Sequence, residues 1–283
     1  MRIIGVCRFS YPGVGGGFKR DHETAADRAA LLYAPDRMED RFRHFETLTL
    51  PSLAVQHDDD FTFLIVIGTS LPALWRDRLH DLTAPVPQVK VVAKEDDAYH
   101  QIRALRSAVH QEVAANPVDT VQFRLDDDDA VALGFTARLR QIWTDTAPLR
   151  AAHPSLAVDF NMGRIARLSA QGIATRQVVP PFWSCGMAGM FRAGATDALI
   201  QYPHHRIHTF MPTLVYPGEE MFLRGVHDDN DSTSDKAPDN RPLFQNLQPL
   251  DDDGRRHFRD TFNVDEALVR RIFSAPAGTP GTA

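Results

Sequence analysis

Short apolar runs recur along the first 130 residues, and four of them have the length and composition of β-strands. Arg2 to Cys7 is rich in β-branched residues, and Phe61 to Gly68 is almost wholly apolar, which is typical of a strand buried on both faces. Val86 to Val92 and Thr120 to Leu125 show the same preference for β-forming residues. The pattern therefore predicts four strands in the first half of the chain.

Between these strands the apolar residues recur at spacings of three and four, which indicates amphipathic helices. The helical segments expected are Pro35 to Gln56 (Met38, Phe42, Phe45, Thr49 and Leu53 inward, with a break near Pro51), Pro72 to Leu82, and Ala98 to Ala115 (Ile102, Leu105 and Val109 inward). Strands that alternate with helices at this spacing form βαβ units. We therefore expect an α/β fold with a mostly parallel central sheet flanked by helices.

This alternation weakens beyond residue 150. Leu156 to Met162, Ile165 to Leu168 and Gly186 to Arg192 have the pattern of shorter strands, which we expect to be antiparallel. A helix is expected at Thr196 to Gln201. The tail, residues 275–283, is rich in Pro and Gly and is expected to be disordered.

Charge and composition narrow the class of protein. The 283 residues include 31 Lys and Arg against 37 Asp and Glu, and this net charge of −6 disfavours a nucleic-acid binder that neutralises phosphates. The two cysteines, Cys7 and Cys185, are too few for a disulfide framework or a cysteine zinc site. Arg8 interrupts the first apolar run before a signal-peptide core can form, and no apolar run approaches the ~20 residues that cross a membrane. We therefore expect a cytoplasmic protein without a transmembrane segment.

Aspartates occur in five clusters, and one of them differs from the rest. Asp58 to Asp60 and Asp251 to Asp253 fit solvated turns, which is the usual meaning of a charge run. Asp126 to Asp129 instead follows a buried strand directly and runs into an apolar segment. Four such carboxylates raise one another's pKa values unless a cation neutralises them, and oxygen ligands suit Mg²⁺ or Mn²⁺. The position also fits, because open α/β sheets bind ligands at the carboxyl ends of their strands.

A metal of this kind usually binds the phosphates of a substrate as well as the protein. Arg8, Arg103 and Arg124 are candidates for further contacts with such an anion. Arg124 has an equally weighted alternative as a structural ion-pair partner, because it points to the face opposite Leu125.

The strand that ends in Arg-Leu-Asp-Asp-Asp-Asp resembles the D-x-D signature of glycosyltransferases with the nucleotide-sugar-binding α/β fold known as GT-A. Phe42 to Gln56, with its Pro-Ser-Leu-x-x-Gln sequence, and the Phe61 to Gly68 strand that follows resemble the rhamnosyltransferase family of bacterial polysaccharide synthesis. The resemblance covers roughly residues 2 to 235. A lone D-x-D is weakly specific, whereas these motifs at this spacing are moderately specific.

The resemblance implies a single GT-A-like domain over residues 1–274, with a nucleotide-binding half at about 1–130 and an acceptor half at about 131–274. It implies a metal-dependent, inverting glycosyltransferase that moves a sugar, with rhamnose as one candidate, from a UDP-, GDP- or dTDP-linked donor to a glycan or lipid-linked acceptor. Such a protein is bacterial, and peripheral association with the inner membrane stays open.

The family pattern also assigns metal ligands. It implies that Asp126 faces the ribose or a metal-bound water and that Asp128 binds Mn²⁺ or Mg²⁺. The fourth aspartate leaves a second register open, with Asp127 and Asp129 in these places, and Asp127 is also expected to contact the nucleotide sugar. His227 resembles the downstream histidine that completes the metal site. The rival group His204-His205-x-x-His208 is expected to be a surface loop.

Gly218 to Arg224 resembles the acidic motif that opens a helix in inverting GT-A enzymes, where a carboxylate deprotonates the acceptor hydroxyl. The resemblance implies Glu220 or Glu219 as the catalytic base, a role that requires a carboxylate on a rigid element. The alternative is that the two glutamates only complement the dipole of that helix.

Two further residues have roles implied by the resemblance. Asp97 follows the third predicted strand and is a candidate for contact with the nucleotide base. Trp183 lies in a Pro-rich aromatic segment between the two halves, where its ring can stack on an acceptor sugar. A buried aromatic anchor is equally consistent with Trp183.

Two other function classes stay open. A Mg²⁺-dependent phosphohydrolase also uses paired aspartates at a strand end, but the familiar haloacid-dehalogenase-like kind places its first motif on the N-terminal strand, and here Arg8 ends that strand. A non-catalytic sugar- or nucleotide-binding module is disfavoured by the acidic residues retained at both positions.

Overall fold

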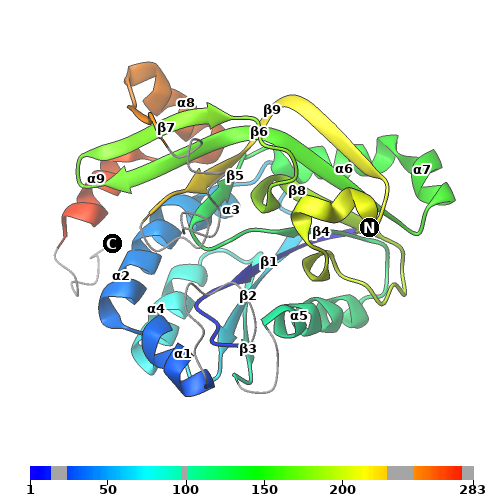
Figure 1. Cartoon of the computed structure of the whole chain (residues 1–283), viewed down its shortest axis with the longest axis horizontal. Coiled ribbons are helices and arrows are strands. Elements are labelled where there is room, and N and C mark those ends of the chain that lie inside the picture. The colour runs from blue at the N-terminus through cyan, green and yellow to red at the C-terminus, as the bar shows by residue number, and fades with distance from the viewer. Residues whose placement is uncertain (14–23, 97–100, 228–244, 276–283) are drawn as a thin grey trace.

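Four parallel strands form one half of the central sheet in the computed structural model, which describes residues 1–13, 24–96, 101–227 and 245–275 (Figure 1). Their order in space is β3 (Val89–Lys94), β2 (Phe61–Gly68), β1 (Arg2–Arg8) and β4 (Thr120–Arg124). All neighbouring pairs in this set are parallel. The four predicted strands are confirmed, although the third begins three residues later than expected.

The other half of the sheet is mainly antiparallel. It continues from β4 through β8 (Met187–Phe191), β6 (Ser155–Ser169), β7 (Gly172–Val178) and β10 (Gln248–Pro249), and the long strand β9 (Thr213–Gly225) pairs with β6 and with the short β5 (Asp129–Val131). Strand β9 runs parallel to β6 and antiparallel to β5. One continuous sheet therefore joins the two predicted halves, and the change of direction occurs at β4, whose end carries the four aspartates.

Helices cover both faces of the parallel strands. The α-helices in the described part of the chain are α1 (Ala25–Leu32), α2 (Pro35–His44), α3 (Leu50–Ala54), α4 (Ala73–Thr83), α5 (Gln101–Ala115), α6 (Phe135–Asp145), α7 (Ala147–Ala152), α8 (Asp252–Phe262) and α9 (Glu266–Ser274). Successive residues of a strand point to opposite faces, so Ile4 and Val6 of β1 pack toward α5 while Ile3 and Cys7 pack into the larger core with Phe42. This double burial explains why the strands are almost continuously apolar. The mixed α/β class expected from the sequence is confirmed.

The helix expected at Pro35 to Gln56 has no break at Pro51. Helix α2 continues into a π-helical segment, Phe45–Thr49, and then into α3, which carries Pro51 near its start. The wider turn lets the Leu50 N–H bond to the carbonyl of Phe45, five residues back. Proline lacks the N–H that an α-helix interior would use, and the π-helical segment with its changed hydrogen bonding directly precedes Pro51.

Several boundaries beyond residue 150 differ from expectation. The two short strands predicted at 156–162 and 165–168 are one strand, β6, and its register with β9 shifts between Phe160 and Gly163, where β9 has the extra residues. Glycine is required at position 163 because a side chain would overlap Phe222 of the neighbouring strand. The helix expected at 196–201 is only a short 3₁₀ turn, Leu199–Gln201.

One residue of α5 also differs from expectation. Ile102 was expected to face inward, but it is 36% exposed.

The tail predicted to be disordered lies, apart from Ala275, outside the described residues. Among the described residues, no helix is both long and apolar enough to cross a membrane.

Candidate active site

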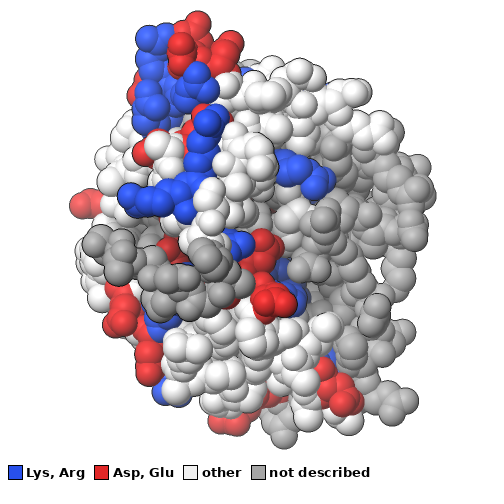
Figure 2. Space-filling view, turned by 90° about the vertical axis from the view of Figure 1, so that its left-hand side faces the viewer, with Lys and Arg blue, Asp and Glu red and all other residues white. Residues whose placement is uncertain are grey.

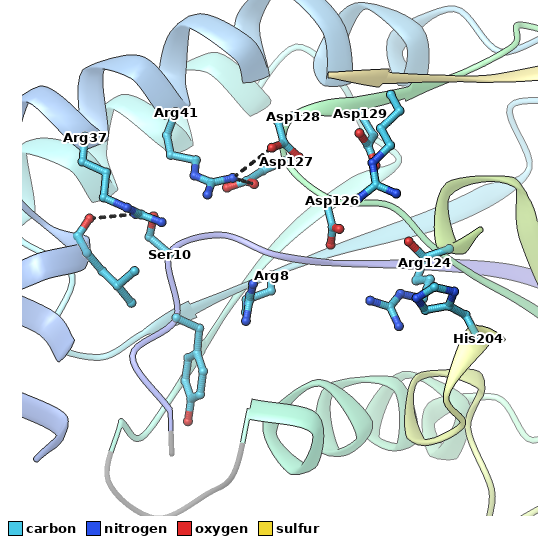
Figure 3. Close-up of a pocket in the computed structure, with 14 residues that line it drawn as sticks. Arg8, Ser10, Arg37, Arg41, Arg124, Asp126, Asp127, Asp128, Asp129 and His204 are labelled. Atoms are coloured by element: carbon cyan, nitrogen blue, oxygen red, sulfur yellow. Dashed lines mark hydrogen bonds and ion pairs between the residues drawn. The ribbon is translucent and has the colours of Figure 1, made fainter. Parts of the chain in front are cut away.

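A pocket opens at the carboxyl end of β4, where the parallel and antiparallel halves of the sheet meet (Figure 3). It is lined by Arg8, Ser10, Tyr11, Leu32, Arg37, Arg41, Arg124, Asp126, Asp127, Asp128, Asp129, Ser184, His204 and Arg224. Figure 2 shows acidic side chains gathered in a hollow with basic side chains beside them. The location agrees with the general position of ligand sites in open α/β sheets.

The four aspartates form the turn between β4 and β5. The Asp129 N–H donates to the carbonyl of Asp126 at 3.2 Å, and the Gly225 N–H of β9 donates to the carbonyl of Asp128 at 3.1 Å. A side chain at position 225 would overlap that carbonyl, so the sequence needs glycine there. On the other side, the Thr49 hydroxyl of the π-helical segment donates to the carbonyl of Asp129 at 2.8 Å. The acidic turn is therefore held by α2–α3 from one side and by β9 from the other.

Three of the four carboxylates are buried, and arginines compensate them. Asp127, Asp128 and Asp129 are 2%, 5% and 3% exposed, whereas Asp126 is half-buried. Arg41 of α2 forms an ion pair with Asp127 and lies 3.5 Å from Asp128, as the dashed lines in Figure 3 show. Burial lowers the pKa of Arg41, but the charges of Asp127 and Asp128 outweigh it and raise that pKa above its ordinary value.

The carboxylates respond differently to this environment. Burial raises the pKa of Asp127 and that of Asp129, and the charge of Asp128 adds to both shifts. Burial also acts on Asp128, but the hydrogen bond with His227 and the charge of Arg41 outweigh it and hold the pKa of Asp128 well below its ordinary value. Asp128 is therefore the carboxylate most firmly kept ionised.

The structure brings together the two residues expected to share a metal. His227 follows β9, and its Nε2 lies 2.8 Å from Oδ2 of Asp128. Neighbouring ligand atoms that are each about 2.1 Å from one ion lie about 3 Å apart, so the pair is spaced as two adjacent metal ligands. The donor set of carboxylates and one imidazole suits Mn²⁺, and its oxygens also suit Mg²⁺.

A buried oxygen gives a second test of whether a metal fits. Oδ2 of Asp127 is buried and has no hydrogen-bond partner among the described residues. A carboxylate oxygen in this state favours a cation ligand.

Basic side chains face the acidic turn across the pocket. Arg8 at the end of β1 hydrogen-bonds to Gln101 of α5, and Arg37 of α2 donates to the Ser10 hydroxyl at 3.3 Å. Arg124 lines the pocket from β4 and forms no ion pair with a carboxylate of the described residues (Figure 3). This position fits the anion-contact alternative for Arg124 better than the structural ion pair.

Other predicted binding residues are not part of this pocket. Arg103 lies on the exposed face of α5, in a shallow surface hollow with Arg106 and His110. Its placement there corrects the expectation that it joins Arg8 and Arg124, and the reason is the helical period, which turns residue 103 away from Leu105. Asp97 lies outside the described residues.

The prediction that the acidic motif opens a helix is wrong, because Glu219 and Glu220 lie inside strand β9. Glu219 forms a two-bond ion pair with Arg138 at 2.8 and 2.7 Å. Glu220 pairs with Arg164 and lies 3.3 Å from Nε2 of His257. Neither glutamate lines the pocket, and Glu220 is four residues along the strand from Arg224, which corresponds to about 13 Å.

Trp183 is a buried anchor. It is 7% exposed, and the guanidinium of Arg224 lies 4.7 Å from its ring centre. Asp159 of β6, 0% exposed, accepts a hydrogen bond from the Phe182 N–H at 3.0 Å and so holds the same segment. Burial raises the pKa of Asp159 to about 6. This fits the structural alternative for Trp183 and not sugar stacking, because Trp183 does not line the pocket.

The histidine group 204–208 is a 3₁₀ helix, His204–Thr209, and not a loop. His204 lines the pocket opposite the aspartates, with its Nδ1 2.6 Å from the carbonyl of Phe182. Burial lowers its pKa to about 4, and the charge of Arg124 adds to this shift. His204 is therefore neutral at pH 7.

Sequence reasoning missed Arg37, Arg41, Arg224 and Ser184 as pocket residues. For Arg41 a signal existed, because it lies three residues after the buried Met38 and beside the buried Phe42. A charged residue this close to the apolar face of a helix needs a buried partner.

Both cysteines lie behind the acidic turn. Burial raises their pKa values well above the ordinary value, and the charge of Asp127 adds to the shift of Cys7 as that of Asp129 adds to the shift of Cys185.

Comparison with known families agrees with the sequence motifs. A profile of the family described as "Putative rhamnosyl transferase" matches residues 2–239. The chain belongs to this family. The family resemblance predicted from the sequence is thereby confirmed. No curated protein matches its sequence.

Solved structures match this family member only at low identity. S. aureus TarS 1–349 in complex with UDP-GlcNAc is 11% identical with a TM-score of 0.43, over 97% of this chain and 71% of that chain. The same protein in complex with UDP is 12% identical with a TM-score of 0.42, over 80% and 61%. HddC from Yersinia pseudotuberculosis complexed with GMP-PN is 8% identical with a TM-score of 0.29, over 80% and 90%. In a further match the chain spans only 60% of TarS 1–349.

Proposed function

We propose that this protein transfers a sugar from a nucleotide-sugar donor to a hydroxyl group of a glycan or lipid-linked acceptor, by a metal-dependent, inverting displacement. The observation that carries the proposal is the pocket itself: a buried acidic turn faces Arg8 and Arg124. A divalent cation and a diphosphate together complete this charge pattern. The family description supports the sugar-transfer class and names rhamnose as the candidate sugar.

Asp126, Asp128 and His227 are the proposed ligands of a Mn²⁺ or Mg²⁺ ion, with Asp127 beside them at the nucleotide sugar. When bound, such an ion supplies positive charge to the diphosphate as it leaves. Arg41 of α2 holds Asp127 and Asp128 in place, and its charge helps to keep Asp128 ionised. A fixed arrangement of this kind avoids reorganisation at the moment of reaction.

Arg8 and Arg124 are the proposed phosphate contacts. Both point into the pocket from the ends of neighbouring parallel strands, β1 and β4 (Figure 3). Guanidinium groups bind phosphate oxygens through charge-assisted hydrogen bonds, which are about twice as strong as neutral ones. They therefore hold the leaving diphosphate in the orientation that an in-line displacement requires.

The test is calorimetric titration of UDP, GDP and dTDP, each with and without Mn²⁺. We expect one nucleotide to bind best, to require the metal, and to bind at least tenfold more weakly to Asp128→Asn. Asp253→Asn, which removes an exposed carboxylate at the start of α8, is the matched control and should bind as the wild type does. Failure of all three nucleotides to bind in the presence of metal would contradict the proposal and favour the phosphohydrolase alternative.

A further inference from the structure

His227 presents its two ring nitrogens to two different acidic groups. Its Nε2 lies 2.8 Å from Oδ2 of Asp128, whereas its Nδ1 lies 3.7 Å from Oδ2 of Asp40 on α2. The first distance is that of a good hydrogen bond, and the second is too long for one. When Nε2–H donates to Asp128, Nδ1 carries the lone pair and faces Asp40.

His44 completes a group of three ligands on this side of His227. It lies one helical turn after Asp40, so both side chains project from the same face of α2. Its ring centre is 4.6 Å from that of His227. Asp40, His44 and His227 can each offer one ligand atom within 4.8 Å of the other two.

An unsatisfied nitrogen on His44 points independently to a ligand. The side chain is 2% exposed, and its Nδ1 lies 2.9 Å from the backbone carbonyl of Asp40. Its Nε2 is buried and has no hydrogen-bond partner among the described residues. Donation from Nδ1 to a backbone carbonyl is the usual support of a metal-binding histidine, because it fixes the tautomer that leaves Nε2 free. A buried nitrogen in this state otherwise costs stability.

The surroundings of the group fit a site of this kind. The π-helical segment begins directly after His44, and such segments are frequent at functional sites. Phe273 of α9 packs edge-on against the His44 ring, with centroids 5.2 Å apart, and closes the site from the C-terminal side. The side chain of Asp40 is 34% exposed and gives a path for entry.

From these contacts we infer that Asp40, His44 and His227 form a transition-metal site that is filled in the protein without nucleotide. Two imidazoles and one carboxylate suit Zn²⁺ or Mn²⁺ and disfavour Mg²⁺, which prefers oxygen ligands. The proposed donor metal uses the carboxylates of Asp126 and Asp128 and reaches His227 through Nε2. A neutral imidazole binds only one cation. While Nε2 of His227 donates to Asp128, Nδ1 of His227 is the atom that binds the metal held by Asp40 and His44.

Equilibrium dialysis of the chelator-treated full chain against Zn²⁺ or Mn²⁺, without nucleotide, tests this site. We expect about one ion per chain, and at least tenfold weaker binding in His44→Gln and in Asp40→Asn. Asp253→Asn, which removes an exposed carboxylate at the start of α8, should bind as the wild type does, and Asp126→Asn tests whether the acidic turn holds the ion instead. His110→Gln is the matched histidine control, since its Nε2 is likewise buried without a partner among the described residues but lies on α5, outside the pocket.

Two further measurements separate binding from folding and from catalysis. Pulsed EPR of bound Mn²⁺ should show coupling to nitrogens of two imidazoles in the wild type and of one in His44→Gln. The melting temperature of the wild type should rise with Zn²⁺, and that of Asp40→Asn, whose changed side chain is partly exposed, should not. Each readout is taken without nucleotide, so the test of the metal site stays valid even if the sugar-transfer proposal fails.

The inference is overturned if the wild type binds neither ion without nucleotide. It is equally overturned if His44→Gln and Asp40→Asn bind as the wild type does, or if Asp126→Asn is the variant that loses the ion. In that last case the acidic turn alone holds the metal.

Discussion

Arg41 connects two of the four pocket aspartates to helix α2. Its side chain is 14% exposed, and its guanidinium contacts both Asp127 and Asp128. Removing one partner of such a buried pair leaves the other charge uncompensated, which costs much more than the net value of the pair. The arginine therefore decides both the ionisation of the acidic turn and its position.

For Arg41→Met we expect the free energy of unfolding to fall by about 3–5 kcal/mol, because two buried carboxylates lose their cation. Urea denaturation at pH 7 measures this loss. Arg76→Met is the control, since among the described residues Arg76 pairs only with the exposed Asp77, and the variant should change stability by no more than about 0.5 kcal/mol. Equal effects of the two variants would contradict the role given to Arg41.

The raised pKa of Asp159 predicts that this residue makes the free energy of unfolding depend on pH, with a sign opposite to that of an ordinary ion-paired carboxylate. Its pKa is about 6 when folded against 3.8 for the unfolded group, so the folded state binds more protons between these values. The wild type should therefore gain stability relative to Asp159→Asn as the pH falls from 7 toward 4, by up to about 2–3 kcal/mol. Denaturation of both proteins at pH 7.5, 6 and 4.5 measures the difference. A difference that does not vary with pH would show that Asp159 does not titrate in this range.

At the scale of elements, strand β9 shows what a local motif does not determine. The Gly218 to Arg224 segment has the residue types of a helix start, but it is drawn into the sheet by pairing with β6 and β5. Two of its apolar members, Phe222 and Leu223, are fully buried. Long-range pairing of this kind overrides local propensity, and one sequence does not display it. The parallel strands were predictable because each is buried on both faces and so differs plainly from the helices beside it.

The placement of Glu219 on β9 leads to a direct test of its predicted catalytic role. Since its carboxylate is bound by Arg138 and does not line the pocket, Glu219→Gln should retain sugar transfer within about tenfold of the wild type. A general base contributes about 10²–10⁴-fold, so the two outcomes are well separated. Initial rates with saturating donor measure the effect, and Glu220→Gln serves as a parallel case. A loss beyond 100-fold in either variant would restore the base assignment.

Candidate residues could be predicted wherever a motif lay next to a recognisable strand end. The Asp126–Asp129 turn was found in this way, and His227 was found from its place in the family pattern. Arg224 could not be found, because its position depends on the register between β9 and β5. Arg37 and Arg41 lie on the margin of an amphipathic helix, where periodicity alone does not separate a solvated arginine from a buried one.

At the scale of the whole molecule, the pocket is assembled from both halves of the sheet. Arg8 and Arg124 come from the parallel strands, while Arg224 comes from β9 in the other half. The C-terminal helices α8 and α9 lie beyond the family match, which ends at residue 239. Helix α9 nevertheless contacts α2, because Arg43 donates to the carbonyl of Ala275 at 2.7 Å and Phe273 packs against His44.

The distribution of arginines predicts which of them hold the nucleotide. Arg124→Gln should weaken binding of the preferred nucleoside diphosphate by about 10- to 100-fold, since it removes a charge-assisted hydrogen bond worth about 1.5–3 kcal/mol. Arg103→Gln, on the exposed face of α5, should change the affinity by less than about twofold. Calorimetric titration of both variants with Mn²⁺ present measures the contrast. The reverse result would return Arg103 to the binding site and remove Arg124.

The two buried thiols have a practical consequence for experiments on this protein. Cys7 and Cys185 are each 1% exposed and lie behind the acidic turn, with pKa values raised well above the ordinary value. A thiolate is the form that reacts with alkylating agents, so neither should be modified while the sheet is intact. A single cysteine introduced on the surface can therefore carry a fluorophore without prior removal of the native ones. Alkylation of the native pair would in turn report opening of the sheet at the junction of its two halves.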